Sequence, residues 1–180
     1  MSLFLNSALP TLLVLGMSGP AVAPGSSVRD SIDDTTALAM FEALITYDIE
    51  TSGIAVKKAV NSDVRELANS FEQGHRGLLK NTQELAKKLN MTPAPLKEAP
   101  LGQAHSNALR KLNATKGEEL ERVYLANEIA YHEGAIKILR DTLAPAIKNP
   151  ELKAAVMGAV PAFEAHLAGS QKVATKYHVV

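Results

Sequence analysis

Residues 64–89 constrain the fold of this chain more than any other stretch. Placed on a helix at about 100° per residue, their apolar side chains fall on one continuous face. His75 lies at the centre of that face and not on its polar flank. A lone histidine on an apolar face is usually a core residue bonded to a backbone carbonyl, so it is weak evidence for a site. The same placement recurs in two other predicted helices, and this repetition supports the functional interpretation below.

The rest of the sequence predicts an all-α protein folded as a four-helix bundle. Alanine and leucine dominate the composition, aromatic residues are scarce, and this balance favours helix. The chain has no cysteine, which excludes disulfides, thiolate zinc sites and cysteine nucleophiles. We expect the four helices at 35–60, 63–90, 117–144 and 151–176. Pro145 is expected to end the third of them.

The connections between these helices predict how they are arranged. Residues 61–63 and 148–151 are tight turns, so each joins two antiparallel neighbours. Residues 91–116 are far longer than an ordinary bundle connection and are rich in proline. A crossover that runs the length of the bundle, with a short extra helix at 103–113, explains this length. The prediction is therefore a ferritin-like bundle whose second and third helices are roughly parallel.

An apolar segment at residues 3–23 precedes the predicted bundle. Pro10 and Gly16 interrupt it, and it is too short to be a convincing membrane span. Its small-x-small ending at 21–23 is typical of a secretory signal, although no lysine or arginine precedes it. The alternative is an ordered apolar arm that packs on the domain or on a partner.

Residues 24–34 have the composition of a linker, which divides the chain into two parts. The predicted parts are a leader with its linker at 1–34 and a four-helix domain at 35–180. A secretory leader predicts a periplasmic or secreted protein. Lys and Arg together number 19, as do Asp and Glu, so no charge excess indicates nucleic acid or an anionic membrane as a partner. A homodimer is compatible with the pattern, which indicates no particular protein partner.

Four polar residues interrupt the apolar faces of the four predicted helices at one level. Asp48 lies within the face of the first helix, and His132 and His166 lie at the centres of the third and fourth. Residues equally far from a tight turn face each other in an antiparallel hairpin. Asp48 and His75 satisfy this condition in the first hairpin, and His132 and His166 satisfy it in the second. We therefore expect all four side chains to meet near one plane.

Three imidazoles and a carboxylate in a dry core need an explanation. Protonated together, the rings would repel each other, whereas neutral and unpaired rings would leave donors unused. A divalent metal resolves both problems, so we expect a mononuclear transition-metal site with zinc or iron as the preferred ion. Its expected ligands are Asp48, His75, His132 and His166. The alternative is a structural network in which these groups bond to each other and to water.

Three glutamates are second candidates for the site, either as ligands or as partners of ligands. Glu72 precedes His75 by three residues, as in the Glu-x-x-His motif of di-iron bundles. The fourth helix has Phe163 where the second such glutamate should stand, so a full di-iron set is missing. Glu50 and Glu128 lie close enough along their helices to contribute.

The constellation resembles the DUF4142 family over residues 36–175. The matching features are a carboxylate on the first helix, central histidines on the other three, and the pairs Tyr124-Leu125, Val160-Pro161 and His166-Leu167. The family pattern has an aspartate before each of the first two histidines, where this chain has Gly74 and Tyr131. The resemblance implies an exported bacterial protein with a ferritin-like fold and a core site.

These observations favour an exported bundle protein that binds a transition metal for sequestration, sensing or modest redox chemistry. A second hypothesis is a non-catalytic envelope or stress protein whose polar core is structural and holds no metal. An oxidase is disfavoured because carboxylates are too few. The sequence does not decide whether the protein is an enzyme.

Overall fold

The computed structural model describes residues 32–96 and 100–178, and these residues are almost entirely helical. The predicted leader lies outside the described residues, apart from the last part of its linker. The helices are α2 (Asp34–Lys58), α3 (Ser62–Lys88), α4 (Pro100–Ala114), α5 (Gly117–Lys137), α6 (Ala144–Ala146) and α7 (Pro150–Lys176), with a π-helix, η1, at Ile138–Leu143. The prediction of an all-α bundle is confirmed.

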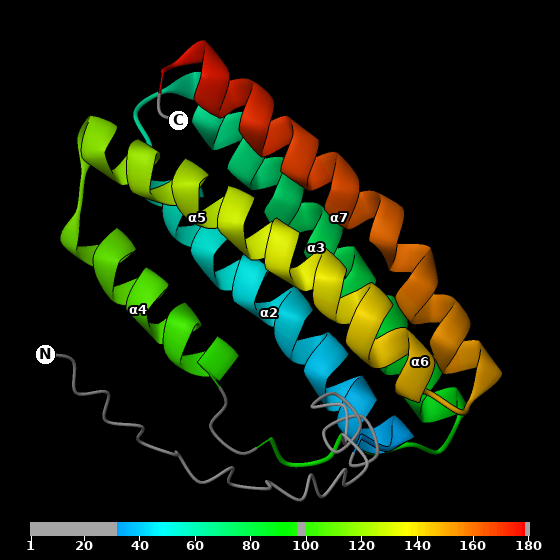
Figure 1. The fold of residues 1–180 in the computed structure, drawn as a ribbon. Coiled ribbons are helices and arrows are strands. Elements are labelled where there is room, and N and C mark those ends of the chain that lie inside the picture. Colours follow the sequence, from blue (N-terminus) through cyan, green and yellow to red (C-terminus); the bar gives the residue numbers. More distant parts are fainter. Residues whose placement is uncertain (1–31, 97–99, 179–180) are drawn as a thin grey trace, which may run out of the picture.

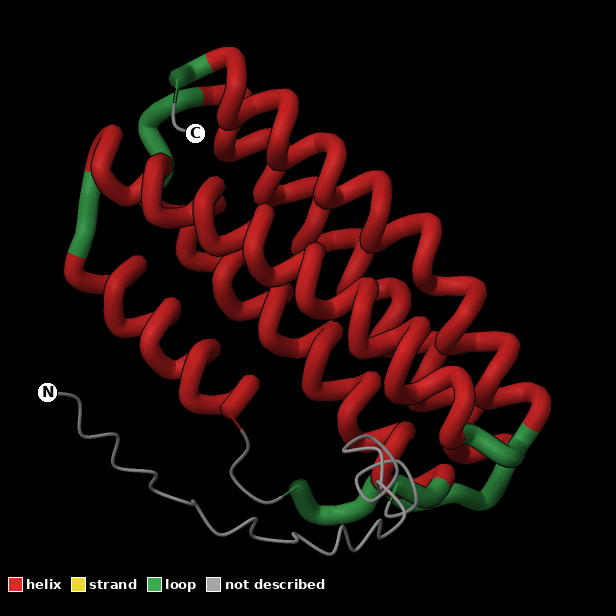
Figure 2. The backbone as a smooth tube through the Cα atoms, viewed as in Figure 1, coloured by secondary structure: helices red, strands yellow, loops and turns green. Residues whose placement is uncertain are grey.

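Four long helices, α2, α3, α5 and α7, form the bundle (Figure 1). α2 packs along α3 and α5, and α7 packs along α5 and α3, so α3 and α5 occupy opposite corners. The sequence colours of Figure 1, followed along the tube of Figure 2, show that α3 and α5 start at the same end of the molecule and are therefore parallel. This is the connectivity that the long crossover predicted.

Side-chain caps explain where three of the long helices, α2, α3 and α7, start. The Asp33 carboxylate accepts a hydrogen bond from the Thr36 amide at 2.7 Å at the start of α2. The side-chain oxygens of Asn61 and Asn149 do the same for α3 and α7, whose first amides have no partner within the helix. Both tight turns thus end in an asparagine that fixes the start of the next helix.

The crossover is more regular than expected. Its helix α4 begins at Pro100, earlier than predicted, because a proline is tolerated in the first turn, where its missing N–H has no helical partner. α4 lies along α2 and α5. The Lys58 ammonium donates to the carbonyls of Leu112 and Asn113 at 2.8 and 3.0 Å, which fixes the far end of the crossover.

The expectation that Pro145 ends the third helix is wrong. After α5 the chain continues as η1 and then α6, which contains Pro145, and it turns to extended backbone at Ile147. Pro145 has no N–H to bond to the carbonyl four residues earlier, and its ring crowds that carbonyl. A wider turn relieves this crowding, so the proline follows a π-helix instead of terminating the coil.

The apolar core is divided into two clusters. One lies toward the η1 end and includes Leu38, Phe41, Leu139, Val156 and Phe163. The other lies toward the start of α5 and includes Val64, Ala68, Leu120, Tyr124 and Ala174. On α5, His132 lies between Leu125 of the second cluster and Ala135 of the first. A polar layer therefore separates the two clusters at the level that the sequence predicted.

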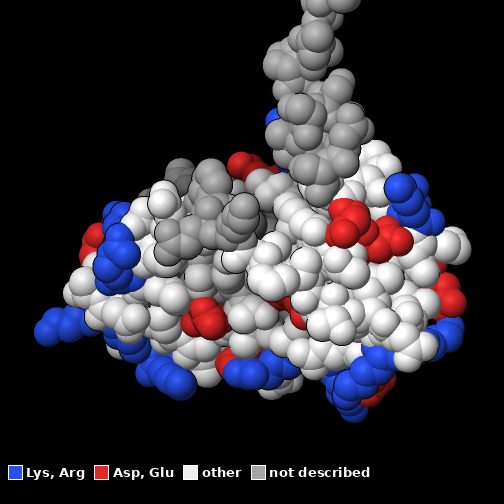
Figure 3. All heavy atoms as spheres, turned by 90° about the horizontal axis from the view of Figure 1, so that it is seen from below, with Lys and Arg blue, Asp and Glu red and all other residues white. Residues whose placement is uncertain are grey.

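The surface carries mixed charge. In the view from below in Figure 3, acidic and basic side chains lie close to one another around the margin. Within the described part of the chain, no helix combines the length and apolarity that a bilayer crossing requires.

Candidate metal centre

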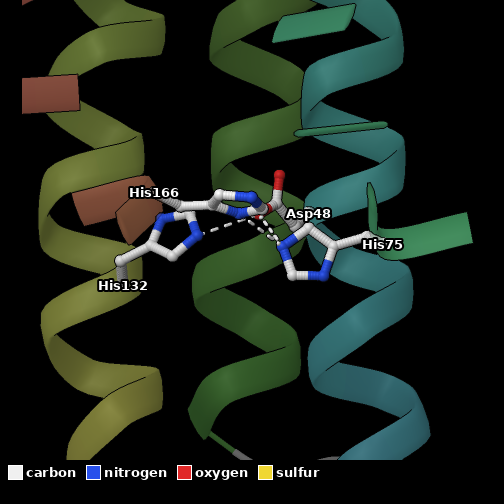
Figure 4. Close-up of side chains that lie close together, drawn as sticks. All are labelled: Asp48, His75, His132 and His166. Carbon is white, nitrogen blue, oxygen red and sulfur yellow. Dashed lines mark hydrogen bonds and ion pairs between the residues drawn. The ribbon is translucent and has the colours of Figure 1, made fainter. Parts of the chain in front are cut away.

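Four side chains, one from each long helix, point toward one another in the polar layer (Figure 4). They are Asp48 of α2, His75 of α3, His132 of α5 and His166 of α7, and each offers a donor atom within 4.8 Å of the other three. Asp48 Oδ2 is 2.7 Å from His75 Nε2 and 3.1 Å from His132 Nε2. His166 Nδ1 is 3.1 Å from His75 Nε2.

Three of these side chains are closed off from solvent. Asp48 and His132 are 0% exposed and His75 is 1% exposed, whereas His166 is only partly buried. Aromatic rings line the layer: Phe71 stacks on His166 at 4.0 Å between centroids, and Phe163 meets His75 edge-on at 4.9 Å. A carboxylate in such surroundings is stable only with close cationic or hydrogen-bonding partners.

Asp48 is held in its ionised form. Burial alone would raise the pKa of this carboxyl, but the imidazoles of His132 and His75 outweigh burial and hold the pKa well below its usual range. The Ser52 hydroxyl donates to Asp48 Oδ1 at 2.7 Å, and Ser52 in turn lies 3.0 Å from the Tyr124 hydroxyl. These contacts fix Oδ1, so Oδ2 is the oxygen that faces the histidines.

The tautomer of His132 follows from its own helix. Its Nδ1 lies 2.9 Å from the Glu128 carbonyl oxygen, which can only accept, so Nδ1 carries the hydrogen. In the neutral ring, Nε2 then has a lone pair and faces the ionised Asp48 oxygen. Both atoms are buried without an aligned hydrogen-bond partner. Two electron-rich atoms at 3.1 Å repel unless a cation lies near both, either a proton on Nε2 or a metal ion.

His75 and His166 add two more donor atoms to the same point. Burial, together with the nearby rings of His75 and His132, lowers the pKa of His166 to about 4, so this ring is neutral at neutral pH. Only one hydrogen can lie between His166 Nδ1 and His75 Nε2. The same His75 Nε2 also contacts Asp48 Oδ2. Three ring nitrogens and a carboxylate oxygen therefore converge, and one cation satisfies all four.

The three glutamates that were second candidates for the site do not join this cluster. Glu50 instead contacts the ring of His105 at 2.6 Å, and Glu72 forms an ion pair with Arg76 at 2.6 Å. Glu128 is fully buried beside the cluster, with Oε2 at 3.7 Å from His132 Nδ1. It is thus a neighbour of one ligand candidate and not a fifth member of the group.

Glu128 has its own polar partners, which the sequence analysis missed. The Thr51 hydroxyl and the Asn127 amide donate to Glu128 Oε1 at 3.1 and 3.3 Å. Burial raises the pKa of Glu128, and the charge of Asp48 raises it further. Thr51 lies one helical turn after Asp48, which was a usable signal. The pairing of His105 with Glu50 had no such signal, because it depends on the path of the crossover.

Comparison with known proteins gives one family and several similar folds. The profile of the family described as "Domain of unknown function (DUF4142)" matches residues 19–173. Comparison with curated proteins finds no match. A DUF305 fragment from Deinococcus radiodurans superimposes with a TM-score of 0.70 at 14% identity, over 79% of this chain and 95% of that one.

Two structures of CopM are also similar in fold. The Cu(II)-bound form has a TM-score of 0.62 at 14% identity and covers 81% of this chain and 99% of that one. The Ag-bound form has a TM-score of 0.61 at 12% identity and covers 81% of this chain and 98% of that one. At these identities the likeness concerns the fold.

Proposed function

The chain belongs to the DUF4142 family, and from this premise and the geometry of its core we propose that it binds one divalent transition-metal ion. The ligands are Asp48, His75, His132 and His166. The observation that supports the proposal best is the set of four convergent donor atoms. Among them, Asp48 Oδ2 and His132 Nε2 are buried side by side without an aligned hydrogen bond.

The donor set narrows the choice of ion. Imidazole nitrogen suits zinc, copper, nickel and iron, and the carboxylate balances part of the positive charge. For the same nitrogen and oxygen ligands, affinity rises from iron(II) to copper(II) and then falls to zinc. The sequence analysis favoured zinc or iron. The fold shared with Cu(II)-bound CopM adds copper(II) as a candidate for this chain.

The number of protein ligands favours a site that stores the metal ion over a site that catalyses a reaction. Catalytic zinc sites usually have three protein ligands and an open position, whereas structural sites use four. Here four donors come from four different helices, so an ion bound by all of them would also tie the bundle together. We propose sequestration of the ion as the role, in an exported protein if the apolar segment at 3–23 acts as a leader.

Metal content tests this proposal directly. Protein prepared in metal-free buffer is titrated with zinc and with copper(II), and elemental analysis after desalting should give one ion per chain. His75→Ala should lose this ion. His105→Ala is the matched control, because it removes a histidine that contacts Glu50 outside the cluster. Wild-type protein that retains no ion, or His75→Ala protein that retains the full amount, contradicts the proposal.

A structural polar core without metal is the second candidate function. It is supported by the bonds that already link polar groups in this layer, from Tyr124 through Ser52 to Asp48 and from Thr51 to Glu128. The same titration separates the two candidates, because a structural network predicts no bound ion and no change in melting temperature when metal is added.

A further inference from the structure

We propose that the metal ion enters and leaves through a groove between α3 and α7, and that His166 is the ligand that opens to let it pass. This inference rests on the proposed function, since it concerns the route to the same four ligands. It assigns a kinetic role to one of the ligands, His166, and to groove residues that bind no metal themselves.

The groove reaches two of the four ligands. Its volume is about 310 Å³, and His75 and His166 are among its lining residues. Its α7 side includes Ala155, Gly158 and Ala162, and its α3 side includes Gly74. These residues have small side chains or none, so little material separates solvent from the histidine rings.

Glycine at position 74 matters for access to His166. A Cβ atom at Gly74 would lie 3.8 Å from both Cε1 and Nε2 of the His166 ring, so a longer side chain there would crowd this edge of the ring. On the other wall, a Cβ at Gly158 would meet nothing within 4 Å. The path to the ring is therefore open on both sides.

Burial distinguishes His166 from the other three ligands. Asp48, His75 and His132 are at most 1% exposed, whereas His166 is partly exposed at the groove. A ligand that can swing toward solvent without breaking the core is the one expected to dissociate first. His75 adds an independent sign, because its Nδ1 is buried without a partner in a side chain that lines the groove. A water or another small polar ligand in the groove would supply that partner.

A second cavity, between α2, α4 and α5, leads elsewhere. It measures about 200 Å³ and is lined by Thr51, Asn127 and His105, among others, and by none of the four proposed ligands. Thr51 and Asn127 each donate to Glu128 and not to a proposed ligand. This comparison favours the groove between α3 and α7 as the route.

Filling the groove tests the proposal. Ala162→Leu and Gly158→Leu place a large side chain in the groove at exposed positions of α7, so neither removes a core contact. Ala154→Leu is the matched control, because Ala154 is exposed on the same helix and does not line the groove. Zinc-loaded protein is mixed with EDTA, and zinc release and uptake are followed by stopped-flow with a fluorescent zinc indicator.

Both filled variants should release and take up zinc more slowly by about tenfold or more, with equilibrium affinity within about twofold of wild type. Ala154→Leu should exchange zinc at the wild-type rate. Wild-type exchange rates in both filled variants, with zinc still bound and circular dichroism unchanged, overturn the inference and leave the metal site standing. If wild-type protein binds no zinc or copper(II) at all, the proposed function fails and the route fails with it.

Discussion

His132 donates its Nδ1 hydrogen to the carbonyl of Glu128 one turn earlier on α5, and this bond leaves Nε2 facing Asp48. A helix therefore sets the tautomer of a buried histidine without help from any other element. Second partners of this kind orient the histidines of many metal sites. Helix α5 thus turns the lone pair of His132 Nε2 toward the bundle centre, and α2 places the Asp48 carboxylate opposite it.

Asp48→Asn should weaken zinc binding by about 100-fold or more, because it removes the only charged oxygen of the proposed ligand set and keeps its shape. Chelator competition measures the affinity. The control is Asp63→Asn, which removes a partly exposed carboxylate in the first turn of α3 that pairs with Lys176, away from the cluster. Equal affinities for the two variants would remove Asp48 from the ligand set.

Glu128→Gln and Glu128→Ala should behave differently. Because burial and the Asp48 charge raise the pKa of Glu128, glutamine resembles the protonated form and should leave stability close to wild type. Alanine removes the side-chain acceptor of the Asn127 amide, leaves the Thr51 hydroxyl with only the backbone carbonyls of α2, and should lower the free energy of unfolding by about 1–3 kcal/mol. Urea denaturation of the metal-free variants measures both effects. A glutamine variant as unstable as the alanine variant would contradict this account of Glu128.

Bound metal should stabilise the bundle. A free metal concentration of about 100 times Kd adds roughly 2.7 kcal/mol, which corresponds to a rise in Tm of roughly 5–10 °C for a domain of this size. His132→Ala should abolish the rise, whereas His105→Ala should retain it. Differential scanning calorimetry with and without zinc gives the comparison. A rise that persists in His132→Ala would point to metal bound outside the core.

The stability of the metal-free protein should fall in mild acid through His166. Its pKa is about 4 in the folded protein against 6.5 as the ordinary value, so between these values the unfolded chain binds a proton that the folded chain does not. The contribution of the neutral His166 ring to the free energy of unfolding is therefore complete above pH 6.5 and decreases as the pH falls toward 4. The His166→Gln variant has no ring that binds this proton, so its Tm should decrease less than that of the wild type between pH 7 and 4.5. Parallel melting curves for the two proteins over this range would show that His166 does not titrate as expected.

Much of the architecture could be predicted from the sequence. The family resemblance and the all-α bundle with parallel α3 and α5 are both confirmed. Apolar periodicity identified the long helices, and the tight turns at Asn61 and Asn149 set which residues lie at one height. The meeting of Asp48 with three histidines follows from these two local facts, because a residue's distance from a turn fixes its level in a hairpin.

The roles of the glutamates could not be predicted, because they depend on directions around the helix axes and on the crossover. Glu50 and Glu72 lie near the right level, yet they pair with His105 and Arg76. Of the three candidate glutamates, Glu128 faces inward, where the Thr51 hydroxyl and the Asn127 amide donate to it. A rotation of one residue step, about 100°, separates a buried carboxylate from an exposed one.

The sequence by itself determined where the helices lie and that four polar side chains share one level, because both depend on spacing along the chain. Only the tertiary structure decided which nitrogen atoms face Asp48 and how Pro145 is accommodated after a π-helix. It also decided that His166 is partly exposed at the groove, whereas His75 lines the same groove but is buried. These features arise from contacts between residues far apart in sequence, and no local spacing specifies them.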